Sequence, residues 1–398
     1  YSKIASDNVA SVDLADSNLI LTRQITGETT DGVGDLVIPI SSVGITSALF
    51  DTFDAEKYSV TYSDGSIEDL TSDQFTLSGG GNQITLSGLT ASQSNVVVNT
   101  TVKKIGIKSK TKDFTRSSKV TISNTSSGVS TSTSSLTTSS YYGTRVEDKV
   151  ISLNVPDVVN VVAIYESLNS SSPTLDSLEF PSGLALNTNS ILGEKIQGRT
   201  SGAIAQIVTR SSATVVEFVY LNSKTFSVGE VVDFEESDIS SIIQSITLGN
   251  YQNITNKYSL DKGHREDYLD YSRIVRKRDG YIPSHKLLVI YNNYTIPASD
   301  SGDVFTVNSY SDERFTTDIP TLPSGVRASD TLDFRPRVSA YNVGVSTYSP
   351  FDFDSRSFTT TVVTPSESSL IGYDFYLPRI DRVVLDKLGN FSVIKGVS

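Results

Sequence analysis

The chain has 398 residues, a formal net charge of −12, 37% apolar residues, and neither cysteine nor methionine. This length suffices for roughly two to four domains. The lack of cysteine excludes disulfides, thiolate catalysis and zinc–thiolate sites. The acidic balance argues against nucleic-acid binding, which needs clustered Lys and Arg, and no run of about 18 apolar residues could span a membrane. Because position 1 is Tyr, we expect a piece of a longer chain.

Residues 1–40 are predicted to form an extended arm with at most short strands. Two short apolar runs, at 19–21 and 36–38, are separated by the loop-like sequence GETTDGVGD. Such a segment is too poor in apolar residues to build its own core. We therefore expect it to lie on another domain or on a partner chain.

Residues 41–123 show the alternation of a half-buried β-sheet. Tyr58, Val60 and Tyr62 alternate with polar residues, Asp64-Gly65 is a hairpin signal, and Gly79-Gly80-Gly81 is a turn. Turn signals at short intervals predict a sandwich of immunoglobulin or fibronectin type. The lysines between positions 103 and 119 form either a basic interaction face or, more simply, a solvated edge protected by charge.

Residues 124–150 are interpreted as a Ser/Thr-rich linker, because the segment cannot bury enough apolar surface to fold alone. Residues 151–190 and 247–398 are predicted to form one composite β domain. Its nearly continuous apolar run from Val158 to Tyr165 predicts a strand buried on both faces. Within this domain, residues 191–246 contain about five strand-length runs separated by glycines, which predicts an inserted small closed barrel.

The last segment, 372–396, is predicted to contain a hairpin. Val383 and Leu385 form one arm, a turn through Gly389-Asn390 follows, and Phe391 and Val393 form the other arm. The fold class expected for the whole chain is mainly β, with several antiparallel sandwich or barrel domains in series after an extended N-terminal arm.

Few residues suggest chemistry. His264, in Gly-His-Arg-Glu-Asp, has no visible catalytic partner, so no catalytic residue is assigned. Asp352 and Asp354 lack the spacing of an EF-hand, and Gly32-Val33-Gly34 lacks the third glycine of a dinucleotide site. We therefore expect no metal, no cofactor and no enzymatic activity.

Acidic, basic and aromatic residues recur together near the C-terminal end. They are interpreted either as an ion-pair network that fastens the loops of the last domain or as ordinary surface charge. The candidate interaction residues are Arg265, Tyr271, Arg273, Asp333, Arg335, Arg337, Tyr376, Arg379, Asp381 and Arg382.

Residues 258–396 contain, in order, YSLDKGHREDYLDYSRIV, KLLVIYNNY, SGDVFTVNSY, TLDFRPRV and YDFYLPRIDRVVLDKLGNFSVIKG. This ordered series resembles a domain of unknown function in large virion structural proteins of T4-like marine cyanophages, and the resemblance extends over about residues 41–398. It implies a tail, baseplate or fibre component located in the virion, and it carries over no catalytic residue.

The expected function is therefore that of a non-enzymatic structural component of a phage tail. Its partners would be other tail or baseplate proteins and further copies of itself, with a homotrimer inferred by analogy with fibres. The alternative is a cell-surface or virion adhesin whose tyrosines bind host carbohydrate. A glycan-degrading β-solenoid is disfavoured, because neither a repeat nor a carboxylate pair is visible.

Overall fold

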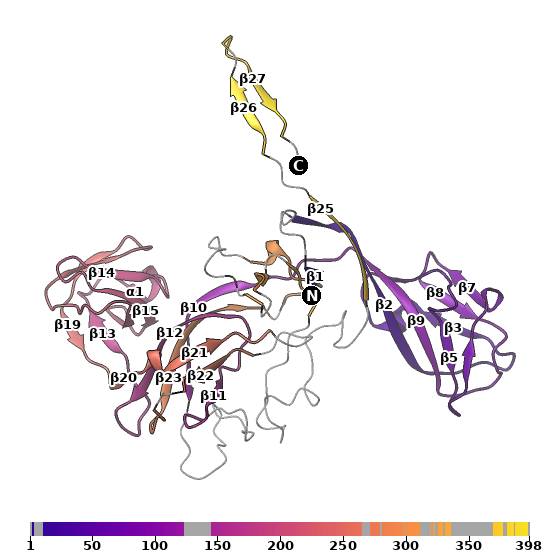
Figure 1. Cartoon of the computed structure of the whole chain (residues 1–398), viewed down its shortest axis with the longest axis horizontal. Coiled ribbons are helices and arrows are strands. Elements are labelled where there is room, and N and C mark those ends of the chain that lie inside the picture. The colour runs from indigo at the N-terminus through magenta and orange to yellow at the C-terminus, as the bar shows by residue number, and fades with distance from the viewer. Residues whose placement is uncertain are drawn as a thin grey trace.

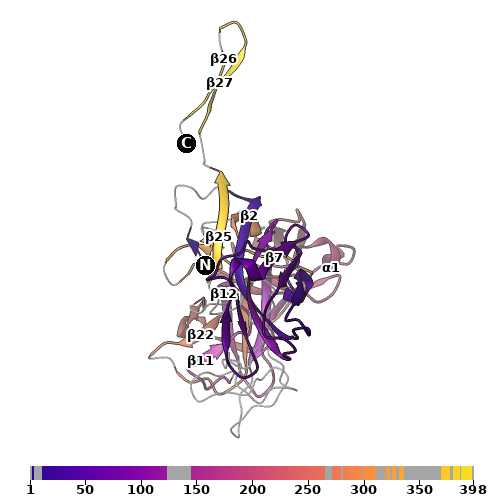
Figure 2. The same cartoon turned by 90° about the vertical axis from the view of Figure 1, so that its right-hand side faces the viewer.

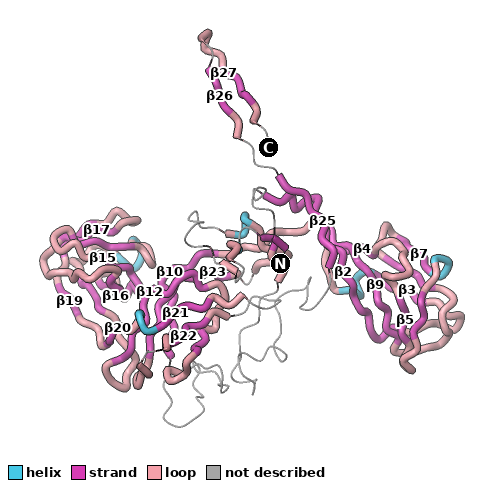
Figure 3. Tube along the Cα trace, viewed as in Figure 1, coloured by secondary structure: helices cyan, strands magenta, loops and turns pink. Residues whose placement is uncertain are grey.

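In the computed structural model, the protein consists mainly of antiparallel β-sheets (Figures 1 and 3). The structure describes residues 2–3, 11–122, 145–264, 271–278, 281–297, 299–310, 319, 321–322, 325–328, 331–335, 369–376, 380–385 and 387–396. The expected fold class, mainly β with several sandwich or barrel units, is confirmed. A central unit lies between a sandwich and an inserted half-barrel (Figure 1).

The sandwich packs a six-stranded sheet on a three-stranded sheet. Apolar side chains alternate along these strands, so each sheet buries one face, with Leu21, Ile38 and Val98 in the core. The larger sheet contains β2 (Ser11–Glu28), β4 (Ala48–Phe50), β5 (Ser59–Thr61), β6 (Ile67–Asp69), β9 (Val96–Ile105) and β25 (Ser369–Tyr376). The smaller sheet contains β3 (Leu36–Pro39), β7 (Phe75–Ser78) and β8 (Gln83–Leu86), and short 3-10 turns occupy Ile40–Val43 and Ser72–Gln74.

The predicted boundary at residue 40 does not separate an arm from this sandwich. β2 pairs with β9 along most of its length, and β3 pairs with β8. Leu19 and Ile38, from the two apolar runs of the expected arm, are fully buried in the sandwich core. β2 and β3 are therefore integral strands of the sandwich and not an arm laid on another domain, because their pairing completes both sheets.

The central unit combines a four-stranded sheet, in the order β10-β23-β12-β20, with a three-stranded sheet, β11-β22-β21. Alternate residues of β23 point to opposite sides. Leu287 and Val289 pack toward the small sheet, whereas Leu288 and Ile290 pack toward the insert. The strands are β10 (Asp113–Ile122), β11 (Val150–Ser152), β12 (Val158–Ser167), β20 (Tyr251–Asn253), β21 (Tyr258–Asp261), β22 (Arg273–Arg276) and β23 (Leu287–Thr295), with a 3-10 turn at Thr255–Lys257.

This arrangement corrects the predicted end of the sandwich at residue 123. β10 was assigned to the sandwich, yet it pairs with β23 of the central unit. The sequence pattern of a strand does not reveal its pairing partner, because that partner lies about 170 residues further along the chain. β12, predicted to be buried on both faces, is mostly buried, although Asn160 within it is exposed.

The insert forms one seven-stranded sheet in the order β18-β17-β14-β15-β16-β13-β19. β18 and β19 are its two edges, so it is an open half-barrel and the prediction of a closed barrel was wrong. It also extends beyond the predicted limits of 191–246, because β13 pairs with both β16 and β19. Its elements are β13 (Asp176–Glu179), α1 (Leu186–Asn189), β14 (Lys195–Gly198), β15 (Ile204–Arg210), β16 (Val215–Tyr220), β17 (Val231–Phe234), β18 (Ser240–Ile242) and β19 (Ser245–Thr247).

The insert is fastened to β10 by polar contacts. Arg116 forms a two-pronged ion pair with Glu236 of the insert. The Ser117 hydroxyl donates to the carbonyl oxygen of Ile207 at 2.7 Å and accepts from the Gln206 amide at 2.8 Å. These bonds satisfy polar groups that the apolar contact around them would otherwise leave buried and unpaired.

Two small two-stranded elements complete the described chain. β1 (Ser2–Lys3) pairs with β24 (Thr331–Leu332), near the 3-10 turn Val307–Ser309. β26 (Arg382–Leu385) pairs with β27 (Phe391–Ile394), which confirms the predicted C-terminal hairpin. The hairpin stands away from the rest of the molecule in both views (Figures 1 and 2). In the part of the chain that the structure describes, no helix has the length and apolar character needed to cross a membrane.

Candidate functional site

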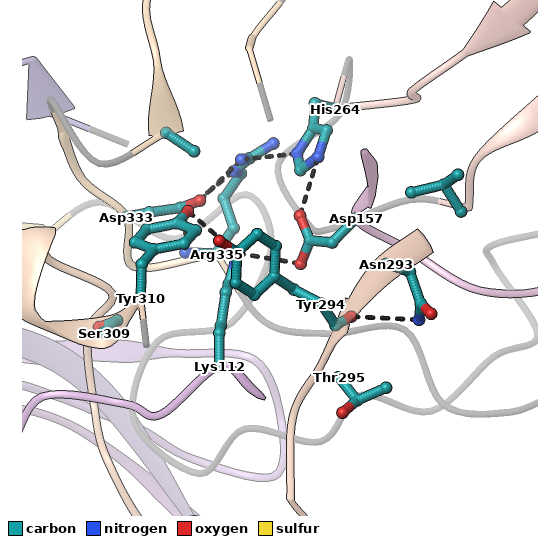
Figure 4. A network of polar contacts seen from close by, with 12 residues as sticks. Lys112, Asp157, His264, Asn293, Tyr294, Thr295, Ser309, Tyr310, Asp333 and Arg335 are labelled. Atoms are coloured by element: carbon teal, nitrogen blue, oxygen red, sulfur yellow. Dashed lines mark hydrogen bonds and ion pairs between the residues drawn. The ribbon is translucent and has the colours of Figure 1, made fainter. Parts of the chain in front are cut away.

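The main concentration of buried charge lies beside the central unit, where Lys112, Asp157, His264, Asp333 and Arg335 form a continuous chain of contacts (Figure 4). We call these five residues the charge chain. Their side chains are at most 3% exposed. Because unpaired charges are very costly to bury, each of the five residues needs a partner. Each finds one within the charge chain.

Local backbone geometry aims the two central members at each other. Asp157 and His264 both adopt left-handed conformations, with φ of 56° and 63°. Asp157 directly precedes β12, and its carbonyl oxygen accepts from the backbone N–H of Tyr294 at 3.1 Å. His264 follows β21 and Gly263, which also has positive φ. Strained conformations of this kind persist only where surrounding contacts fix them.

Lys112 is held in the segment that leads into β10. Its backbone N–H donates to the carbonyl oxygen of Ser309 at 2.8 Å. Its ammonium lies 2.9 Å from Asp157 Oδ2, donates to the Tyr310 hydroxyl at 3.3 Å, and sits 4.3 Å from the centre of the Phe305 ring. An ion pair, a hydrogen bond and a cation–π contact together replace the water that this cation loses on burial.

At the other end, Arg335 clasps Asp333 in a bidentate pair. Nε donates to Oδ1 at 2.9 Å and Nη2 donates to Oδ2 at 2.7 Å. Nη2 also lies 3.2 Å from His264 Nδ1. A guanidinium group can only donate, so Nδ1 must accept this hydrogen bond. The imidazole proton is then on Nε2, which lies 3.0 Å from Asp157 Oδ1. His264 is therefore the neutral link between two ion pairs.

The carboxylates of the charge chain are ionised. Burial alone raises the pKa of Asp157, but the charge of Lys112 and the hydrogen bond from His264 outweigh it, so this pKa lies well below its ordinary value. Burial likewise raises the pKa of Asp333, and the charge and hydrogen bonds of Arg335 more than offset this effect. The two carboxylates thus balance Lys112 and Arg335, and the buried cluster is neutral overall.

This geometry is suited to holding chain segments together rather than to proton transfer. A general base must reach a proton of its substrate, yet His264 is 2% exposed and both of its ring nitrogens already have partners. The contacts join segments that are far apart in sequence, around residues 112, 157, 264 and 333–335. His264, for which the sequence offered no catalytic partner, does have a carboxylate beside it, but in a buried structural cluster.

The candidate interaction residues that the structure describes lie in two different parts of the molecule. Asp333 and Arg335 form the bidentate pair above, Tyr271 is buried, and Arg273 lies 3.9 Å from Asp261. By contrast, Asp381 and Arg382 are exposed on the hairpin segment, where Asp381 accepts from the backbone N–H of Gly396 at 2.9 Å. Outside the described residues lie Arg265, Arg337, Arg379 and the side chain of Tyr376, together with the calcium candidates Asp352 and Asp354.

Taken together, the lysines between positions 103 and 119 form neither a basic interaction face nor a solvated edge. Lys103 is half-buried and Lys108 and Lys119 are more exposed, but Lys104, Lys110 and Lys112 are buried. Lys104 pairs with Asp303 at 3.3 Å, and Lys110 lies 3.9 Å from Asp300. Loop 299–310 supplies the acidic partners of Lys104 and Lys110. Half of the lysines in this run are therefore buried and form ion pairs inside the protein.

Sequence reasoning missed Lys112 and Asp157. Lys112 belongs to a run that resembles a solvated edge, and Asp157 follows Pro156 in an apparently ordinary turn. One signal was available: Asp157 immediately precedes a strongly apolar strand, and a charged side chain that is fully buried almost always has a partner. Among the described residues, no group of three or more His, Cys, Asp or Glu side chains could hold a metal ion.

A polar cavity of about 400 Å³ lies at the junction of the insert and the central unit, lined in part by Arg116, Gln206, Glu236 and Asn292. All four of these side chains already form hydrogen bonds or ion pairs with one another across the junction, and Gln206 also donates to Ser117. Comparison with known proteins adds no functional assignment: no protein-family model, curated protein or solved structure matches the chain.

Proposed function

We propose that this chain is a non-enzymatic structural component of a bacteriophage tail, in the baseplate or tail-fibre region, and that it assembles through its β units and extended segments. The ordered series of sequence phrases described above supports the virion setting. The observation that carries the assembly role is the projecting hairpin β26–β27, which exposes several large apolar side chains to solvent (Figures 1 and 2).

The internal construction of the chain is consistent with a load-transmitting role. The insert is fastened to the central unit by an ion pair and hydrogen bonds, and buried lysine–aspartate pairs tie loop 299–310 to the end of β9 and to the segment that follows it. β25, which precedes the hairpin, pairs with β2 of the sandwich. Long-range fastenings of this kind let force applied at the hairpin pass into the sheets.

Electron microscopy of purified phage particles tests the proposal. Antibody-gold against the sandwich should label the tail, and density for this chain should show much of its surface buried by other subunits. Particles that lack the chain altogether would overturn the proposal.

The alternative, an adhesin that binds host carbohydrate, depends on tyrosines that stack on sugar rings. Tyr58, Tyr165 and Tyr294 are instead among the largest fully buried side chains of the described residues. They belong to the cores of the sandwich and the central unit. Their burial favours the assembly role, and binding of the isolated chain to a glycan array would favour the adhesin.

A further inference from the structure

The hairpin β26–β27 has one entirely apolar face. Residues opposite each other in an antiparallel pair share a face, and the register pairs Val383 with Val393 and Leu385 with Phe391. These four side chains, here called the apolar face, are 56–77% exposed. The opposite face mixes apolar and polar residues, because it pairs Arg382 with Ile394 and Val384 with Ser392.

An isolated two-stranded hairpin is marginally stable in water and needs a third strand or a packing surface. No other described strand pairs with β26 or β27. The apolar face is also larger than the scattered single apolar residues that are normal on a protein surface. The described strands therefore leave the apolar face open to a packing partner.

The central unit offers a matching surface. β12 pairs with β23 on one side, whereas on its other side β20 reaches only Tyr165–Ser167. β21 pairs only with β22 among the described strands. Between these two strand edges lies a cavity of about 260 Å³, here called the edge groove. Its lining includes Val159, Val161, Ile164, Tyr258, Leu260 and Ile274.

The size of the edge groove fits the hairpin. A cavity of about 150 Å³ accepts one benzene-sized group, so the groove has room for the Phe391 ring and a neighbouring aliphatic side chain such as Val393. Its flanking strand edges could also pair with the backbone of an added strand, as in β-strand addition.

The alternative of two hairpins stacked by their apolar faces buries too little surface. Burying one large apolar side chain removes on the order of 100 Å² from water, so the apolar face, 56–77% exposed, offers roughly 300 Å². Two such faces bury roughly 600 Å², about half of the smallest standard interface. Insertion between two strand edges also covers the sides of the hairpin and its backbone, so it buries more.

We propose that the hairpin β26–β27 of one copy docks in the edge groove of a second copy, head to tail. This partner assignment rests on the assembly role proposed above. Because the two contacting surfaces differ, the contact is heterologous and either closes into a ring or continues as a filament. A ring that closes after three copies would give the homotrimer inferred from fibres.

Complementation between two variants of the full chain tests the proposal. The hairpin variant carries Phe391→Ser and Val393→Ser, and the groove variant carries Ser259→Arg and Asn160→Arg. All four positions are exposed, so the cores stay intact. Val33→Ser, at a site 76% exposed and outside the hairpin, is the matched control. Molar masses are measured by light scattering after size exclusion, and circular dichroism confirms folding.

The wild-type chain and the control should self-associate with rising concentration, and each variant alone should stay monomeric. An equimolar mixture of the two variants should form a dimer that grows no further, because one intact hairpin meets one intact groove. A mixture that contains only monomers would overturn the proposal. Self-association of the groove variant on its own would also overturn it. If the two variants fail to complement each other but electron microscopy finds the chain in phage particles, the docking proposal is wrong and the proposed tail role stands.

Discussion

Lys112 and Asp157 lie 2.9 Å apart, and neither side chain has any exposed surface. One precedes β10 and the other precedes β12, and these strands lie on either side of β23 in one sheet. The pair thus joins two strands that have no backbone hydrogen bonds to each other. Breaking a buried pair of this kind costs far more than breaking a surface pair, because one charge stays behind without compensation.

Asp157→Asn should therefore destabilise the protein strongly. Removing one partner of a buried pair costs about 3–5 kcal/mol, and the free energy of unfolding from urea titration measures the loss. Asp233→Asn is the matched control, because it breaks the Arg199–Asp233 pair, whose side chains are 58% and 40% exposed. The control should change stability only slightly. Equal losses in the two variants would contradict the buried-pair assignment.

Acid should destabilise the protein through the same carboxylates. The pKa values of Asp157 and Asp333 are lowered in the folded state from an ordinary value of 3.8. Their stabilising contribution is fully present above that unfolded-state value and is lost as the pH falls toward the folded-state pKa. Denaturation midpoints measured from about pH 6 to about pH 3 should fall in the wild type and fall less steeply in Asp157→Asn. If the midpoints of the wild type and of Asp157→Asn fall in parallel with pH, Asp157 does not contribute to the acid sensitivity.

His264 should be neutral and protonated on Nε2. The chain contains only two histidines, so nitrogen-15 NMR of the labelled protein can assign each ring. Nδ1 of His264 should show the shift of an unprotonated nitrogen, because Arg335 donates to it at 3.2 Å. His285, whose side chain is 38% exposed, serves as the internal comparison. Protonation of His264 at Nδ1 at neutral pH would contradict the contact with Arg335.

Gly193→Ala should loosen the insert from the central unit. An added Cβ would lie 2.3 Å from Cβ of Arg116, and φ at Gly193 is +79°. Gly183→Ala is the matched control, because φ there is +100° but nothing lies within 4 Å of the added atom. Both variants bear the left-handed backbone cost of roughly 1–2 kcal/mol. Thermal unfolding should show the larger loss for Gly193→Ala, and equal losses would mean that the contact with Arg116 relaxes freely.

Much of the local structure could be predicted from the sequence. The Asp64-Gly65 turn lies between β5 and β6, the three glycines at 79–81 lie between β7 and β8, and Gly389 lies in the turn of the C-terminal hairpin. These features follow from side-chain alternation and from the ability of glycine to adopt positive φ. Both causes act within a few residues, so a single sequence is enough to detect them.

The assignment of strands to sheets could not be predicted. β2 and β10 have similar alternating patterns, yet one completes the sandwich and the other joins the central unit. Alternation determines which side of a strand is buried, but not which surface covers it. The closed barrel expected for the insert failed for the same reason, because closure depends on whether edge strands such as β18 and β19 reach each other.

The sequence by itself determined that this protein is built from β-strands without cysteine chemistry, and that its described end is an apolar hairpin. Only the tertiary structure decided that Lys112 is an internal charge and that Asp157 and His264 belong to its cluster. The burial of a charge depends on partners supplied by segments tens to hundreds of residues away, and no local pattern contains that information. The hairpin's exposure is equally a tertiary fact, because the same apolar alternation would suit a buried strand.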